Sequence, residues 1–114
     1  MTAIERLDET PKYIERNALI RRLERNNKCL LGLENNLNSY ICEPKTRLLF
    51  ERLTVIKTSL MELKKSQREL IGGLKNKTIY FEESKSLISM QLESYNKLEI
   101  VILEYIGMSK MHGN

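Results

Sequence analysis

The stretch that decides the fold is Leu49–Leu70, LFERLTVIKTSLMELKKSQREL, in which apolar residues recur at alternating spacings of four and three. An α-helix turns once in about 3.6 residues, so side chains at this spacing share one narrow stripe along the helix. Six apolar residues form this stripe, which we call the seam: Leu49, Leu53, Ile56, Leu60, Leu63 and Leu70. Because such a stripe is stable only under another helix, the sequence predicts a helical partner for it.

Two kinds of partner fit the seam. It is either the core of a three-helix bundle made by one chain or the contact surface of an oligomerising coiled coil, and an exposed flank on so long a hairpin favours self-association. Gln67 and Asn27 interrupt the apolar positions. Polar residues at such places either specify register and oligomeric state or lie at a wet edge.

Residues on both sides of the seam predict three helices. Thr10-Pro11 is a start signal, because threonine caps free N–H groups and proline at the first helical position has none to satisfy. Cys42-Glu43-Pro44 interrupts the helix, and Gly72-Gly73 ends the next one. We expect helices at about residues 11–42, 44–72 and 78–106, a flexible segment at 1–10 and a frayed tail at 107–114.

The short break near Pro44 predicts that the first two helices fold back as antiparallel neighbours. Partners should then have residue numbers that sum to roughly 87. The expected pairs are Leu37 with Leu49, Leu33 with Leu53, Leu30 with Ile56, Leu23 with Leu63 and Ile20 with Gln67. Apolar residues meet in four of the five pairs, which supports a hairpin.

Length and composition agree with a single all-α domain. The chain has 114 residues, of which 41% are hydrophobic and 30% charged, with two prolines, five glycines and no tryptophan. The predicted architecture is a long antiparallel helical hairpin plus a third helix, as in a three-helix bundle or coiled coil. The net charge of +4 is compatible with an anionic partner but is common in soluble proteins.

Basic residues gather at the end of the predicted hairpin that lies far from Pro44. This basic patch consists of Arg21, Arg22, Arg25, Lys64, Lys65 and Arg68. A phosphate backbone, an anionic membrane surface or an acidic protein would bind it by charge, and binding would weaken with salt. The alternative is that long basic side chains solvate a helical face and cover apolar surface with their stems.

The sequence offers no constellation for catalysis. The only histidine, His112, lies in the predicted tail, so a histidine-based triad or zinc site has no framework. Cys29 and Cys42 would lie about 20 Å apart on one helix, which excludes a bridge, and Cys29 should be a small buried hydrophobe. We expect a protein that is not an enzyme and has no cofactor, metal ion or small-molecule substrate.

Several features bear on the compartment. Acidic residues interrupt any apolar run at the N-terminus, so no secretory signal is expected, and the apolar run at Ile100–Leu103 is far too short to span a bilayer. With unpaired cysteines, these features predict an intracellular protein, cytoplasmic or nuclear, without a membrane span.

From about Asn17 to Lys97 the order of features resembles the N-terminal helical region of Gag polyproteins of BEL/Pao-type long-terminal-repeat retroelements. The residues that carry the likeness are Arg21, Arg22 and Lys28; Tyr40 and Ile41; Leu49, Arg52 and Leu53; Gln67 and Glu69; and Tyr80, Phe81, Glu82 and Glu83. The chain lacks the tryptophan that such regions often carry in the second helix. The resemblance implies a Gag-derived or domesticated fragment with a protein-interaction role, and it does not transfer nucleic-acid packaging.

The functional prediction is a non-catalytic helical protein-interaction or scaffold protein. It would act through the seam, with itself or another helical protein as partner. The alternative is a basic helical module that binds nucleic acid or another anionic surface through the basic patch.

Overall fold

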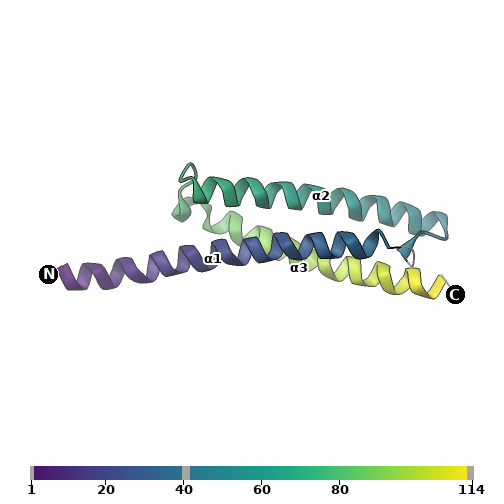
Figure 1. Cartoon of the computed structure of the whole chain (residues 1–114), viewed down its shortest axis with the longest axis horizontal. Coiled ribbons are helices and arrows are strands. Elements are labelled where there is room, and N and C mark those ends of the chain that lie inside the picture. The colour runs from purple at the N-terminus through teal and green to yellow at the C-terminus, as the bar shows by residue number, and fades with distance from the viewer. Residues whose placement is uncertain (1, 40–41, 113–114) are drawn as a thin grey trace.

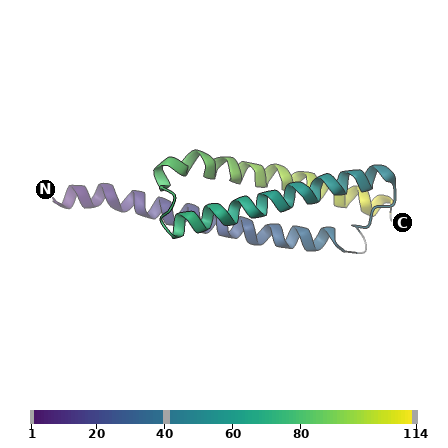
Figure 2. The ribbon, with the colours of Figure 1, turned by 90° about the horizontal axis from the view of Figure 1, so that it is seen from above.

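Three long helices make up the structure, a computed structural model that describes the backbone of residues 2–39 and 42–112 and the side chains of residues 14–39 and 42–111. They are α1 (Thr2–Leu37), α2 (Arg47–Lys75) and α3 (Phe81–His112). Each helix packs against the other two in an elongated body of 69 × 22 × 18 Å (Figures 1 and 2). The predicted all-α, three-helix architecture is confirmed.

Helix α2 begins and ends at well-defined caps. The Thr46 hydroxyl accepts a hydrogen bond of 3.1 Å from the backbone N–H of Leu49, which satisfies one of the free donors at the helix start. The helix ends at Lys75, three residues later than predicted. Gly72 and Gly73 therefore lie within its last turns and do not end it. A side chain on Gly73 would collide with Ile79, so this glycine lets the loop fold back onto the helix end.

Helix α1 differs from the prediction at both ends. It starts at Thr2, so the backbone of residues 2–10, predicted to be flexible, is helical and continues through Pro11, where only one backbone donor is missing. It stops at Leu37 instead of continuing to Cys42, and the Ser39 hydroxyl donates to the Asn36 carbonyl at 2.8 Å just after the helix end. Tyr40 and Ile41 lie outside the described residues.

Helix α3 also continues past its predicted end. The prediction placed the end at Ile106, with Gly107 as a cap and a frayed tail, but the helix runs on to His112. Met108 packs against the core and Ser109 is fully buried, so contacts with the rest of the bundle hold the extra turn in place. The predicted frayed tail is therefore wrong for residues 107–112, and residues 113–114 lie outside the described part.

The antiparallel hairpin of α1 and α2 is present, but its predicted register is wrong. The Asn27 Nδ2 atom donates to the Lys64 carbonyl at 3.1 Å and to Gln67 Oε1 at 3.3 Å, so Asn27 lies where the prediction placed Ile20. The connection between Leu37 and Arg47 is nine residues long. Relative to the prediction, α2 is shifted along α1 by about one heptad.

Two buried apolar clusters form the core, one toward each end of the bundle. The first cluster includes Leu30 and Leu37 of α1, Leu49, Leu53, Ile56 and Leu60 of α2, and Tyr95, Leu98, Ile102 and Tyr105 of α3. The second includes Ile20 and Leu23 with Leu70, Leu74, Ile88 and Leu92. Gln67 lies between the two groups of α2 residues and is completely buried, so it is not at a wet edge.

Candidate functional site

The seam is covered by helices of its own chain. Leu49, Leu53, Ile56, Leu60 and Leu70 are at most 7% exposed, and Leu63 is half-buried against the first cluster. Residues of α1 and α3 occupy the space that a partner helix would need. The sequence left open whether the seam is a bundle core or an oligomer contact. In the structure it is part of the internal core. A surface for partners must therefore be sought elsewhere on the bundle.

Part of the basic patch surrounds an open groove between α1 and α2, which we call the α1–α2 groove. Arg21, Arg25 and Arg68 line it, and its volume is about 910 Å³. Arg22 and Lys65 are exposed outside its lining. Lys64 does not contribute, because its ammonium lies 3.1 Å from the Glu34 carboxylate and its side chain is only 13% exposed. The structure thus brings three of the six predicted residues to one groove.

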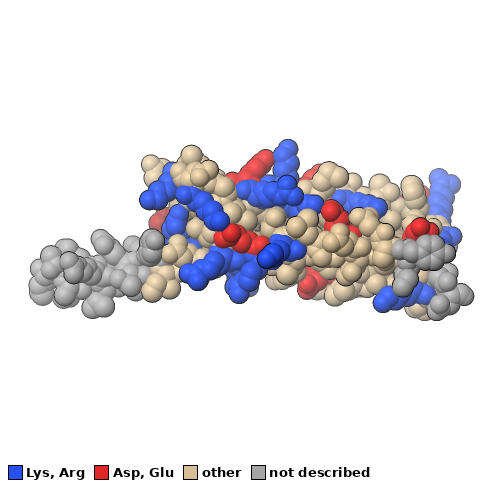
Figure 3. All heavy atoms as spheres, viewed as in Figure 1, with Lys and Arg blue, Asp and Glu red and all other residues tan. Residues whose placement is uncertain are grey.

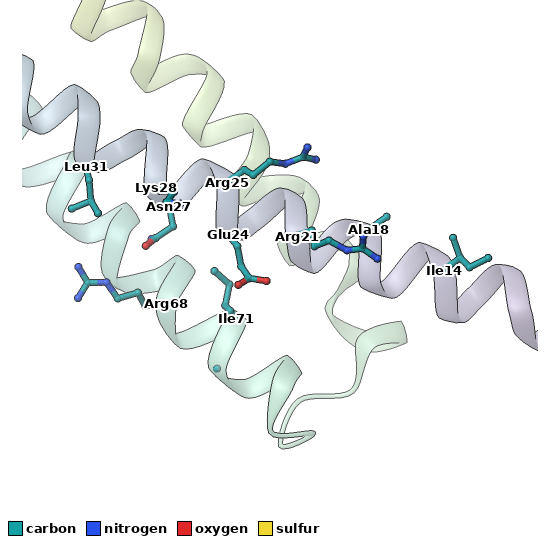
Figure 4. A pocket seen from close by; sticks show the side chains of 11 residues that line it. Ile14, Ala18, Arg21, Glu24, Arg25, Asn27, Lys28, Leu31, Arg68 and Ile71 are labelled. Carbon is teal, nitrogen blue, oxygen red and sulfur yellow. The ribbon is translucent and has the colours of Figure 1, made fainter.

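The groove also has lining residues that the prediction of the patch did not include. Lys28 adds a fourth cation, and the apolar part of the lining comes from Ile14, Ala18, Leu31 and Ile71. In Figure 4, Ile71 lies between the two helices, whereas Arg25 and Ile14 point away from α2. Positive charge and apolar surface therefore alternate across the outer side of α1 and the space beside α2.

The charges in the groove are largely unneutralised. Its one carboxylate, on Glu24, is paired with Lys75 at 2.9 Å. Arg21, Arg25, Lys28 and Arg68 form no ion pair with any side chain that the structure describes. Lys and Arg side chains gather over α1 and the adjoining end of α2 in Figure 3. The groove is consequently an electropositive surface with apolar patches, suited to an acidic ligand.

The neighbouring cations and acids hold the bundle together rather than facing a ligand. An Arg16 guanidinium nitrogen donates to the Leu74 carbonyl at 2.7 Å, which satisfies an acceptor at the end of α2. Lys85 is 3.4 Å from Glu15, which ties the start of α3 to α1. These contacts hold α1 against the end of α2 and the start of α3, near the loop that joins those two helices.

A second, smaller groove lies between α2 and α3. Its volume is about 480 Å³, and its exposed apolar lining comes from Leu48, Val55 and Val101. Glu51, Arg52 and Glu104 flank these residues, so cations and anions are mixed there. Its lining has two acids and one base, and it gives less indication of what would bind.

Two tyrosines of the core, Tyr95 and Tyr105, are buried and hydrogen-bonded within the chain. Burial raises the pKa of Tyr95, and the hydrogen bond of 2.9 Å from its hydroxyl to Glu99 acts in the same direction. Burial also raises the pKa of Tyr105, whose hydroxyl donates to the Cys42 carbonyl at 2.9 Å. Both phenols therefore stay protonated, and the bond of Tyr105 ties α3 to Cys42.

The cysteines are both free, as expected, but only Cys42 is buried. Cys29, predicted to be buried, is exposed because it lies to one side of the buried row that contains Leu30. No group of three or more His, Cys, Asp or Glu residues that could hold a metal ion occurs in the part of the chain that the structure describes. Among the same residues, no helix is long and apolar enough to cross a membrane.

Comparison with known proteins adds no further assignment. No protein-family model, curated protein or solved structure matches this chain. The resemblance to the N-terminal helical region of BEL/Pao-type Gag polyproteins stays a prediction from the sequence. The function is therefore proposed from the geometry of the chain itself.

Proposed function

We propose that this chain is a non-catalytic helical interaction protein whose α1–α2 groove binds an acidic amphipathic helix of a partner protein. The observation that carries the proposal is the groove lining, in which four cations without ion-pair partners among the described residues surround exposed apolar side chains. An amphipathic helix with acidic flanks matches both features at once. The protein-interaction role implied by the Gag resemblance agrees with this assignment.

Neither charge nor apolar burial is sufficient alone. Exposed ion pairs contribute about 0.2–1 kcal/mol each. Ile14 and Leu31 are 60% and 41% exposed, and covering them would contribute about 1 kcal/mol each. Because the two contributions are of the same order, the groove favours a ligand that supplies carboxylates and apolar side chains together.

The second candidate function is binding of an anionic polymer such as RNA or DNA. It is favoured by the exposed cations Arg21, Arg22, Arg25 and Lys28 within two turns of α1. Against it, the groove lining contains no aromatic residue for bases to stack on, and Glu24 lies among the cations. An acidic helix therefore explains more of the surface than a nucleic acid does.

Fluorescence anisotropy with a designed peptide tests the proposal. The probe is a labelled peptide of about 20 residues, long enough to form a helix, with Leu at three-and-four spacing and Glu at most other positions. We expect saturable binding that weakens at least about tenfold in the variant Arg25→Glu/Arg68→Glu, since two attractions become repulsions. The control Lys57→Glu/Lys110→Glu makes the same charge change at exposed lysines outside the groove and should bind normally.

Two further ligands separate the candidate functions. A scrambled peptide of the same composition has the charge but not the apolar stripe, so it should bind at least about tenfold more weakly. Equal binding of both peptides, together with tight binding of a mixed-sequence RNA that falls steeply with salt, would support the second candidate instead. No binding of either peptide would reject the first.

A further inference from the structure

A polar layer crosses the core of the bundle at the boundary between its two apolar clusters. Each helix contributes one amide side chain to it: Asn27 of α1, Gln67 of α2 and Gln91 of α3. Along each helix this residue lies between a member of the second cluster and a member of the first, as Asn27 lies between Leu23 and Leu30. We call these three residues the amide layer.

The amide layer is deeply placed and only partly hydrogen-bonded. Gln67 is completely buried, Gln91 is 8% exposed, and Asn27 is half-buried and also lines the α1–α2 groove. Asn27 donates to Gln67 at 3.3 Å. Gln67 Nε2 and Gln91 Oε1 are buried without a hydrogen-bond partner among the residues that the structure describes. Because a buried amide is costly to place against apolar side chains, the layer disfavours any arrangement that separates its members.

Apolar spacing by itself permits more than one register of α1 on α2. The core positions of both helices repeat every seven residues, so a slide of one heptad again brings core positions opposite each other. In the structure the numbers of facing residues sum to roughly 94, as for Asn27 and Gln67. In the register predicted from apolar pairing, Gln67 would face Ile20 and Asn27 would face Leu60. Both amides would then lie against apolar side chains.

The connection after α1 leaves this choice of register open. Its nine residues reach up to about 30 Å when extended, whereas a slide of one heptad moves α2 by only about 10 Å. The loop between α2 and α3 is tighter, because residues 76–80 are all it contains and the N–H groups of Thr78 and Ile79 both donate to the Gly73 carbonyl. This loop holds α3 to α2, so the register that needs a further determinant is that of α1.

Two ion pairs also join α1 to α2 in the observed register, Lys64 with Glu34 and Lys75 with Glu24. The side chains of Lys75 and Glu24 are 53% and 40% exposed, so solvent screens their attraction. Loss of the contact between Asn27 and Gln67 would instead leave a completely buried amide without a partner on α1. The amide layer therefore discriminates more strongly between registers than the exposed ion pair does.

We propose that the amide layer determines the register of α1 on α2, and through it the composition of the α1–α2 groove. In the observed register, Arg68 and Ile71 form the α2 side of that groove. After a slide to the alternative register, Met61 and Lys64 would take their places, because each lies one heptad earlier on α2. Asn27 and Gln67 are thus positioning residues for the groove. This inference goes beyond the proposed function, since it concerns the groove whatever binds there.

The distance between two spin labels, measured by double electron–electron resonance, reports the register. The labels are attached at Arg22→Cys and Lys57→Cys, which are exposed sites on α1 and α2 outside the groove lining. Cys29→Ser and Cys42→Ala remove the natural thiols from the full chain. We expect a single distance in the labelled protein with an intact amide layer.

Replacement of the whole layer by leucine should release the register. In Asn27→Leu/Gln67→Leu/Gln91→Leu, we expect a second population whose label distance differs by about 10 Å, because one heptad corresponds to that length along a helix. The melting temperature should stay the same or rise, since apolar residues replace all members of the layer together. A single, unchanged distance in this variant overturns the proposal. Loss of helicity in circular dichroism also overturns it, because the apolar layer should stabilise the bundle.

Two further variants separate register from general packing. Asn27→Gln/Gln67→Asn exchanges the two amides and should keep a single distance, because a polar pair still favours the same alignment. The matched control Asn35→Leu/Ser59→Leu/Asn96→Leu introduces one leucine at an exposed position of each helix and should also keep a single distance. A second distance in this control would show that added leucines alone disturb the register, and would overturn the proposal.

Peptide binding to the same variants distinguishes this inference from the proposed function. If the register splits and the affinity for the acidic Leu-Glu peptide falls, both are supported. If the register splits but the peptide binds with unchanged affinity, the amide layer keeps its role and the α2 side of the groove is not part of the peptide site. If the peptide binds the unaltered chain and the triple leucine variant keeps a single distance, the proposed function stands and this inference fails.

Discussion

The seam of α2 and the row Ile14, Ala18, Arg21, Arg25 and Lys28 of α1, which we call the outer row, have the same spacing but opposite surroundings. Seam residues such as Leu60, 1% exposed, are covered by the chain's own helices. In the outer row, Ile14 is 60% exposed and the basic members face solvent. Spacing of three and four therefore identifies a helix face, whereas the composition of that face indicates whether it is covered within the chain. The row that is apolar apart from Gln67 forms core, and the row that is part apolar and part basic lies at the surface.

The largest effect should come from placing a charge in the seam. Leu60→Asp puts a carboxylate into the fully buried first cluster, and we expect a loss of about 4 kcal/mol or more in the free energy of unfolding, enough to unfold a small domain. Thermal denaturation followed by circular dichroism measures it. The neighbouring variant Met61→Asp, at a position 66% exposed, should change stability by less than about 0.5 kcal/mol. Equal effects at the two positions would contradict the assignment of the seam as core.

A smaller loss is expected where the connection after α1 is anchored. Tyr105→Phe removes the hydroxyl that donates to the Cys42 carbonyl and leaves a buried acceptor unpaired. The free energy of unfolding should fall by about 1–2 kcal/mol in urea denaturation. Tyr80→Phe, at a side chain that is 74% exposed, is the control. Unchanged stability of Tyr105→Phe would mean that the connection is not held by this contact.

Alkaline pH should gradually lower the free energy of unfolding of the bundle. The pKa of Tyr95 is raised in the folded protein by burial and by its bond to Glu99, so above a pH of about 10 the unfolded chain loses phenol protons that the folded chain keeps. The folded state then binds more protons, and stability falls as the pH rises further. Urea denaturation at a series of pH values measures the slope, which should be shallower in Tyr95→Phe. The same slope in both proteins would argue against a buried phenol.

The smallest effect on stability is expected in the outer row. Ile14→Asp should change the free energy of unfolding of the monomer by less than about 0.5 kcal/mol, because the side chain is already in solvent. Binding of the designed acidic peptide should weaken in the same variant, since Ile14 lines the α1–α2 groove. Stability is measured by urea denaturation, and binding by fluorescence anisotropy. A large loss of monomer stability would show that the outer row is covered within the chain after all.

The parts of the candidate site that sequence reasoning missed have a common cause. The basic patch was defined from charge alone. It therefore included Lys64, which pairs with Glu34 in the structure. Ile14 and Leu31 were left out because they are not charged, although both line the groove. The three-and-four spacing of Ile14, Ala18, Arg21, Arg25 and Lys28 was present in the sequence and could have identified Ile14 and Lys28.

By itself, the sequence determined the number of helices and the stripe that α2 buries. Three features act over only a few residues: the seam spacing, Thr46 before α2 and the glycines near its end. The local sequence therefore determines the hydrogen bonds at the helix ends and the stripe that packs. Identification of the seam as a buried stripe needed nothing more.

Only the tertiary structure decided the register of the helices and which helix covers which face. The register is visible in Asn27, which lies beside Gln67 where Ile20 was predicted. The same shift places Lys64 beside Glu34 and leaves Arg25 and Arg68 in one groove. Such contacts join residues far apart in the chain, and their free energies are added only after the loop between them has closed.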